Sequence, residues 1–116
     1  MKNNLNKSQI ERYSRQIILK NVGTFGQKKI INSKVLIIGA GGLGCTIADY
    51  LSRAGVGTIG IADFDKINLS NIHRQNLYNS KDIGKFKVDV AKQKIKSINP
   101  LTKIITYKKK ILDKEL

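Results

Sequence analysis

An apolar run that ends in a glycine-rich turn constrains the fold more than any other segment. Residues 35–38 are Val-Leu-Ile-Ile, and residues 39–44 read Gly-Ala-Gly-Gly-Leu-Gly, which fits the pattern G-x-G-x-x-G. An uninterrupted apolar run is typical of a strand buried on both faces of a parallel sheet. The glycines permit a sharp turn and leave room where a helix starts. We therefore predict a buried parallel strand over residues 34–38 that leads through a glycine turn into a helix.

The residues after the turn complete a unit of strand, helix and strand. Leu43, Ile47 and Leu51 recur every fourth residue, which places them on one stripe of a helix that ends before Gly55. Residues 58–63 are predicted to form the second strand. Two strands joined through a helix in this order are expected to pair in parallel, with a right-handed crossover.

The start of the chain predicts helices outside the sheet. Ser8 and Glu11 have the S-x-x-E spacing of a capping box, which indicates a helix over about residues 9–19. A second, short helix is predicted at residues 27–32, directly before the first strand. Residues 1–33 are therefore interpreted as an N-terminal helical arm.

The end of the chain adds one helix and one strand. Residues 85–98 predict a helix, residues 102–107 predict a third strand, and Asp113 is predicted to begin another helix. The fold class is α/β, with an incomplete Rossmann-like parallel sheet of about three strands over residues 34–116, preceded by the arm. The apolar face of the helix is predicted to comprise Val88, Ala91, Ile95 and Ile98.

The glycine turn has the chemistry of a nucleotide site. Gly39, Gly41, Gly42 and Gly44 carry no Cβ, so a phosphate can approach the backbone and the free N–H groups at the helix N-terminus. Asp63 closes the second strand about twenty residues further on, where an acidic side chain can accept hydrogen bonds from ribose hydroxyls. The alternative is a tight turn that binds no ligand.

The polar segment after Asp63 favours ATP over a nicotinamide cofactor. Asn71, Arg74, Lys85 and Lys87 follow within one long connection, near the edge of the sheet where a ligand of such folds lies. Several cations suit a triphosphate. An NAD-dependent oxidoreductase remains an alternative, because it explains the glycine turn and Asp63, but it leaves these cations without a role.

Five motifs occur in the order seen in ThiF/MoeB-type enzymes, which include the adenylation domains of ubiquitin-activating enzymes. The resemblance extends from Glu11 to about Thr106. Its motifs are Arg12-Tyr13-Ser14-Arg15-Gln16, the Gly-Gly-Leu-Gly turn, Asp63-Phe64-Asp65, Leu69-Ser70-Asn71-Ile72-His73-Arg74-Gln75, and Lys87.

The resemblance implies an adenylyltransferase that activates the C-terminal carboxylate of a ubiquitin-like sulfur-carrier protein of the thiamine or molybdopterin pathway type. Asp63 would hold the ribose of ATP, and Asn71, Arg74 and Lys87 would contact its phosphates. Arg15 would reach the triphosphate bound to a neighbouring subunit, which implies a homodimer. Arg15, Arg74 and Lys87 are the candidate catalytic residues.

The resemblance also implies parts that residues 1–116 do not contain. An aspartate for Mg²⁺, further strands, a carrier-binding surface and a zinc site of paired CxxC motifs would follow residue 116, so the ATP-binding domain is expected to be truncated relative to the family. No metal ligand is assigned within the chain. A non-catalytic remnant that binds nucleotide or a partner is therefore a second alternative.

The remaining features point away from other functions. The net charge of +14 comes mainly from dispersed lysines, which is typical of codon bias rather than of a nucleic-acid site, so no nucleic-acid partner is expected. No membrane segment is expected, and the protein is predicted to be cytoplasmic. Cys45 is interpreted as a core residue and His73 as a solvated one. Asp65 is expected either to orient Arg74 or Asn71, or to cap a turn.

Overall fold

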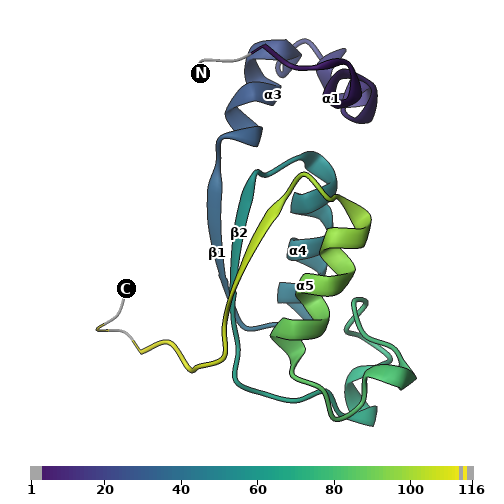
Figure 1. Ribbon diagram of the computed structural model, residues 1–116, viewed down its shortest axis with the longest axis vertical. Coiled ribbons are helices and arrows are strands. Elements are labelled where there is room, and N and C mark those ends of the chain that lie inside the picture. The colour runs from purple at the N-terminus through teal and green to yellow at the C-terminus, as the bar shows by residue number, and fades with distance from the viewer. Residues whose placement is uncertain (1–3, 113, 115–116) are drawn as a thin grey trace.

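Three parallel strands form one sheet in the order β1-β2-β3, which confirms the predicted α/β fold class. The computed structural model describes residues 4–112 and 114. The strands are β1 (Lys34–Ile38), β2 (Thr58–Ala62) and β3 (Lys103–Tyr107). Helix α4 (Gly42–Ala54) joins β1 to β2, and helix α5 (Lys87–Ile98) precedes β3. Both helices lie on the same side of the sheet (Figure 1).

The core lies between the sheet and these two helices. Ile37, Ile59, Ile61 and Ile104 point from the strands toward the helices, because alternate residues of a strand face the same side. The predicted apolar face of α5 is confirmed by the burial of Val88, Ala91 and Ile95 and by the partly buried Ile98. These contacts fix the position of α5 and of the loop that precedes it.

Helix α4 turns small side chains, not its large ones, toward the sheet. Cys45 and Ala48 are buried, whereas Leu43 is 82% exposed and Ile47 is 46% exposed. Of the predicted stripe, only Leu51 packs against the core. The helix ends at Ala54, before Gly55 as predicted, and Gly55 caps it with φ 104° in the left-handed conformation that favours glycine.

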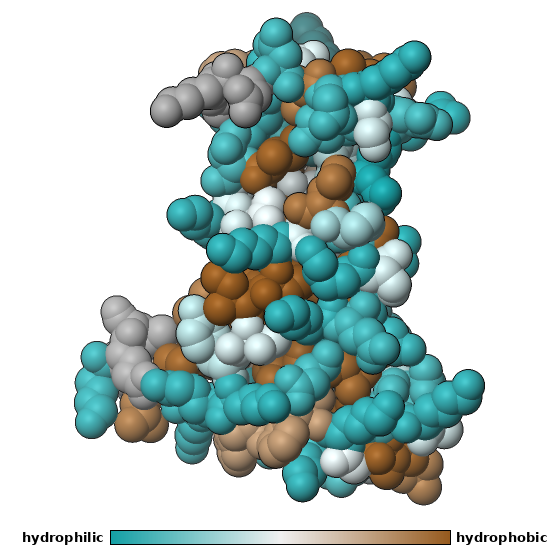
Figure 2. Space-filling model, viewed as in Figure 1, coloured by the Kyte–Doolittle hydropathy of each residue, from teal (hydrophilic) through white to brown (hydrophobic). Residues whose placement is uncertain are grey.

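The prediction that β1 is buried on both faces is wrong. Leu36 is 49% exposed and Ile38 is 52% exposed, because the described residues place no helix on the second face of the sheet. Burial in β1 therefore alternates along the strand. Figure 2 shows hydrophobic surface over this part of the molecule. A hollow of about 270 Å³ on this face is lined by Lys34, Val35, Leu36, Thr58, Gly60, Ile105 and Tyr107.

The N-terminal arm consists of α1 (Lys7–Arg12), α2 (Ser14–Ile17) and α3 (Gly23–Ile31). The capping box predicted at Ser8 and Glu11 is wrong. Asn6 caps α1, since its Oδ1 accepts from the Gln9 N–H and the Gln9 Oε1 accepts from the Asn6 N–H, each at 2.9 Å. The predicted long helix is also interrupted, because α1 ends one residue before Tyr13. The helix predicted from Asp113 lies outside the described residues.

Buried polar contacts attach the arm to the end of the sheet where the strands begin (Figure 1). The Gln27 Nε2 donates to the Ala54 carbonyl at 3.0 Å, and the Gln16 Nε2 donates to the Gln27 Oε1 at 2.6 Å. The Tyr13 hydroxyl accepts from the Asn99 Nδ2 at 2.9 Å. The arm is thus held at the opposite end of the sheet from the glycine turn.

Candidate functional site

The glycine turn connects β1 to α4 and lies at the carboxyl end of the strands. Gly39 has φ 96°, so the first turn position requires a residue that tolerates the left-handed region. A Cβ on Gly44 would lie 1.9 Å from the Gly39 carbonyl oxygen, so only glycine allows α4 to start this close to β1. Gly41 and Gly42 have more space, since a Cβ on either would meet its nearest atom at 3.8 Å. The turn thus keeps its backbone accessible at the start of α4.

Asp63 follows β2 and lies directly beside this turn. Its Oδ2 accepts from the Ala40 N–H and its Oδ1 accepts from the Asp65 N–H, both at 2.7 Å. A carboxylate oxygen can accept more than one hydrogen bond, so the half-buried Asp63 keeps capacity for ligand hydroxyls. The Asp65 carbonyl accepts from the Lys87 N–H at 3.0 Å, which joins the segment after β2 to the start of α5.

The loop between β2 and α5 folds back over the glycine turn. A Cβ on Gly42 would meet the Arg74 carbonyl oxygen, and a Cβ on Gly41 would meet the Gln75 Nε2. Arg74 itself is exposed, and its Nη1 donates to the Ser70 carbonyl at 3.4 Å. Its guanidinium therefore lies on a loop that adjoins the turn.

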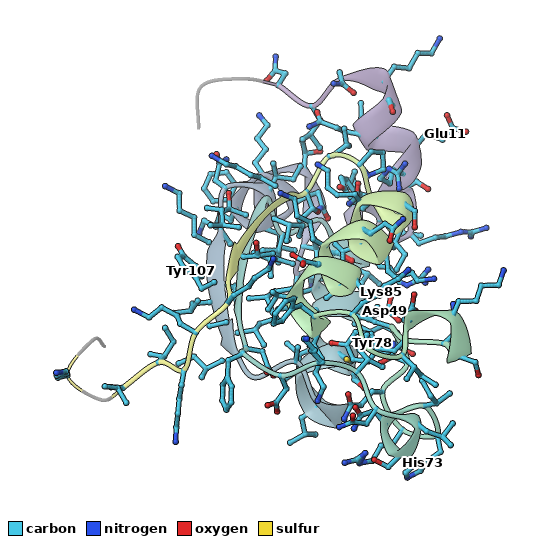
Figure 3. All side chains as sticks on the ribbon, turned by 60° about the horizontal axis from the view of Figure 1, so that its bottom comes forward. Glu11, Asp49, His73, Tyr78, Lys85 and Tyr107 are labelled. Atoms are coloured by element: carbon cyan, nitrogen blue, oxygen red, sulfur yellow. The ribbon has the colours of Figure 1, made fainter. Side chains whose placement is uncertain are left out.

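Asn71 and His73 occupy different positions on this loop. Asn71 is buried, and its Oδ1 accepts from the Asn68 N–H at 2.8 Å, so its side chain caps the local turn. His73 is exposed and lies at the outer end of the loop, away from Tyr78 (Figure 3). The solvated interpretation of His73 agrees with this position.

Gln75 is a candidate site residue that the sequence analysis did not single out. It is 2% exposed, and its Oε1 finds no hydrogen-bond partner among the described residues. Buried polar atoms are almost always paired, so an unpaired one beside a candidate ligand site is informative. Its position after Arg74 in a polar loop gave no signal of burial.

Lys87 is a mostly buried cation at the first position of α5. The residue is 7% exposed, and no residue in the described part of the chain forms an ion pair or a hydrogen bond with its ammonium group. An isolated bridge between Lys66 and Phe86 holds the start of α5 against the loop that follows β2. Lys85, in contrast, is exposed and lies 3.8 Å from the Asp82 carboxylate. Of the two lysines counted among the cations of this connection, only Lys87 thus lacks a carboxylate neighbour among the described residues.

A cavity of about 200 Å³ opens beside the glycine turn and Asp63. It lies at the carboxyl edge of the sheet, where ligands of open α/β sheets bind. Its wall combines the ends of β1 and β2 with the segment that follows β3. The lining residues are Ile38, Gly39, Ala62, Asp63, Phe64, Asp65, Lys109, Lys110 and Ile111.

Cys45 belongs to the core, as predicted, and supports the turn from behind. It is 1% exposed, and its S–H donates to the Ala40 carbonyl at 3.2 Å. Burial raises the pKa of the Cys45 thiol, which favours the uncharged and unreactive form.

The three predicted catalytic residues do not all lie at one site. Arg74 and Lys87 are on the two elements next to the glycine turn, whereas Arg15 is exposed on α2 of the arm. Figure 1 places the arm and the turn at opposite ends of the sheet. Within a single copy of the chain, Arg15 is therefore remote from the turn.

Residues 4–112 and 114 contain no group of three or more His, Cys, Asp or Glu side chains placed to hold a metal ion. None of the helices in this part of the chain is both long enough and apolar enough to cross a bilayer.

Comparisons with known proteins agree with this geometry. The model described as the ThiF family matches residues 13–116. The chain is 47% identical over 105 residues to the adenylyltransferase and sulfurtransferase MOCS3 of Aedes aegypti, covering 90% of the chain and 24% of the relative. It is 42% identical over 101 residues to the sulfur carrier protein adenylyltransferase of Thermus thermophilus, covering 87% of the chain and 37% of the relative.

Among solved structures, the chain resembles that of E. coli MccB with ATP. The TM-score is 0.80 at 31% identity, and the match covers 94% of this chain and 33% of MccB. The chain thus spans between a quarter and two fifths of the length of these proteins.

Proposed function

The chain belongs to the ThiF family, and from that premise we propose that it supplies the ATP-binding part of an adenylyltransferase that acts on a sulfur-carrier protein. The observation that carries the proposal is Lys87, a buried residue whose solvent-accessible ammonium has no partner among the described residues, beside a loop that adjoins a glycine turn. A phosphate group would supply the missing negative charge. The two relatives described above are named as adenylyltransferases, and one of them as acting on a sulfur carrier.

ATP is the substrate that best fits the residues around the turn. Gly41 and Gly42 are partly exposed at the start of α4 and would present backbone N–H groups to a phosphate, and Asp63 would accept hydrogen bonds from the ribose hydroxyls. Arg74 and Lys87 would contact the phosphates. The cavity beside Asp63 leaves space for the remainder of the nucleotide.

The reaction we propose is transfer of the adenylyl group to a carboxylate. An oxygen of the C-terminal carboxylate of a ubiquitin-like carrier attacks the α-phosphorus of ATP and forms a new P–O bond. The bond from the α-phosphorus to the oxygen of pyrophosphate breaks, and pyrophosphate leaves with that electron pair. Arg74 and Lys87 would balance the charge on the phosphates, a purely electrostatic and positioning role. Mg²⁺ is expected in this family, but the described residues offer no ligand cluster for it, so no step is assigned to the metal.

A homodimer would complete the site with Arg15. The stripe of exposed apolar residues on α4 that includes Leu43, Ile47 and Tyr50 begins next to the glycine turn, and Ile18 lies exposed near Arg15. If the arm of one copy packs on α4 of another, Arg15 comes to the partner's turn. The same contact then repeats in the opposite direction, as a two-fold axis requires.

ATP is favoured over NAD as the ligand, because its triphosphate offers more negative charge to Arg74 and Lys87 than the pyrophosphate of NAD does. The proposed carrier is of the thiamine or molybdopterin pathway type, and the proposed compartment is the cytoplasm. The alternative is a chain that binds nucleotide without catalysis, and the following experiment distinguishes the two functions.

A chimera tests the proposed function directly. The matching segment of the Thermus thermophilus sulfur carrier protein adenylyltransferase is replaced by residues 13–116 of this chain, and carrier-dependent ATP–pyrophosphate exchange is measured. We expect exchange that disappears with Arg74→Ala. The matched control is His73→Ala, an exposed neighbour on the same loop, which should leave exchange unchanged. A folded chimera that binds ATP without exchange would establish the non-catalytic alternative.

A further inference from the structure

The central peptide of the glycine turn is held from behind by Tyr78. The Tyr78 hydroxyl donates to the Ala40 carbonyl at 2.8 Å, and the Tyr78 side chain is only 4% exposed. The Cys45 S–H donates to the same oxygen at 3.2 Å, but a thiol is a weak donor. Tyr78 therefore makes the stronger contact to this carbonyl.

The orientation of one peptide follows from this contact. In a trans peptide the carbonyl oxygen and the following N–H point in opposite directions. With the Ala40 carbonyl drawn toward the buried Tyr78 hydroxyl, the Gly41 N–H points away from the core. No residue that the structure describes accepts a hydrogen bond from this N–H. It is thus available to a ligand at the start of α4.

The opposite end of Ala40 is held as well. Its N–H donates to the Asp63 Oδ2 at 2.7 Å, so Ala40 is held on both sides of its Cα. Gly39 and Gly41 flank it and are the residues with the least intrinsic stiffness. Without side-chain contacts at Ala40, the peptide between Ala40 and Gly41 could rotate.

We infer that Tyr78 is a positioning residue for the nucleotide site, which sets the direction of the Gly41 N–H through the Ala40 carbonyl. Tyr78 belongs to the loop that carries Arg74, so the bond from its hydroxyl to the Ala40 carbonyl also ties this loop to the turn. The loop that carries Arg74 and the turn are therefore aligned by one side chain. Figure 3 shows Tyr78 in the interior, on the inner side of the loop whose outer end carries His73.

Tyr13 provides a matched control within the same chain. It is also a buried tyrosine whose hydroxyl makes one hydrogen bond, with the Asn99 Nδ2 at 2.9 Å, but it lies in the arm at the far end of the sheet. Tyr78→Phe and Tyr13→Phe each remove a single buried hydroxyl. A purely structural role predicts the same behaviour for both variants at the nucleotide site.

Hydrogen exchange in the nucleotide-free chain tests the positioning itself. The Gly39 N–H donates to the Ala62 carbonyl at 2.7 Å, and the Ala40 N–H donates to Asp63, so both amides are protected reporters of the turn. We expect Tyr78→Phe to speed exchange of these two amides about tenfold, the effect of losing one net hydrogen bond. Tyr13→Phe should leave them unchanged. Equal exchange at Gly39 and Ala40 in both variants overturns the inference.

Ligand binding tests the consequence and rests on the proposed function. Calorimetry should show that Tyr78→Phe weakens the binding of ATP about tenfold and leaves the binding of adenosine unchanged, since only ATP has phosphates for the Gly41 N–H. Equal weakening of both ligands, or none, overturns the role at the phosphates. If the unchanged chain fails to bind ATP, the proposed function is contradicted, whereas the exchange experiment still decides whether Tyr78 orients the turn.

Discussion

Replacing Lys87 by Met should make the protein more stable and bind ATP less tightly. Lys87 is 7% exposed, its ammonium has no partner among the described residues, and it occupies the first position of α5. A cation at a helix N-terminus opposes the helix dipole, and no carboxylate among the described residues offsets this unfavourable interaction. Met keeps the length of the side chain but removes the charge. The two effects therefore have opposite signs.

The magnitudes follow from these contacts. Removing the unfavourable dipole interaction of Lys87 suggests a gain in unfolding free energy of ~1 kcal/mol. For a domain of this size such a gain raises Tm by about 4 °C. A charge-assisted hydrogen bond to phosphate contributes about 1.5–3 kcal/mol, so the Kd for ATP should rise by a factor of about 10 to 100.

Thermal unfolding and calorimetric titration with ATP measure the two quantities on the same samples. Lys85→Met is the matched control, because Lys85 is an exposed lysine two residues earlier and faces Asp82. It should change ATP affinity less than twofold and should not raise Tm. If Lys87→Met lowers Tm and leaves ATP affinity unchanged, Lys87 has a structural role and the reasoning is refuted.

Three further outcomes are expected from the same geometry. Gly44→Ala places a Cβ 1.9 Å from the Gly39 oxygen, so urea denaturation should show a loss of about 1–3 kcal/mol, and ATP binding should disappear. Asp63→Ala removes the acceptors for two backbone N–H groups and for the ribose hydroxyls. The Kd for ATP should therefore rise at least tenfold, while the circular dichroism spectrum stays native. An unchanged ATP affinity would remove Asp63 from the site. In the full-length chimera, mixing Arg15→Ala with Arg74→Ala chains should restore exchange at one composite site per heterodimer; no recovery in confirmed heterodimers would place Arg15 outside the partner's site.

Local patterns were sufficient to predict the strands and the turn between them. The run at residues 35–38, the glycines that follow and Gly55 each have one strong conformational preference, and the observed β1 and the end of α4 match the predictions. Asp63 was predicted to close the second strand, and parallel strands end at the same edge of a sheet. The structure places Asp63 beside the turn, where it accepts a hydrogen bond from the Ala40 N–H.

Features that depend on packing between distant segments were not predictable. The exposure of Leu36 depends on whether helices cover one face of the sheet or both. The same apolar run occurs in strands of both kinds of sheet. The buried stripe of α4 contains Cys45 and Ala48 because the glycine turn brings that helix close to the strand. Periodicity alone favoured Leu43 and Ile47, whose size does not fit there.

Tyr78 and Gln75 show the same limit at the candidate site. Both lie in a polar loop whose sequence has no regular period. Gln75 ends the motif over residues 69–75 but was given no role there, and Tyr78 belongs to no motif. Their burial arises because the loop folds back on the turn, where Tyr78 reaches the Ala40 carbonyl. A contact between a side chain and one backbone carbonyl 38 residues away leaves no signal in a single sequence.

Parallel calorimetric titrations of the chain with ATP and with NAD test the central claim most directly. Both ligands can use a glycine turn and Asp63, but only ATP brings a triphosphate to Lys87 and Arg74. We predict that ATP binds at least tenfold more tightly than NAD, and that Lys87→Met removes most of this preference. Tighter binding of NAD, or a preference for ATP that survives Lys87→Met intact, would contradict the assignment of this site to a triphosphate.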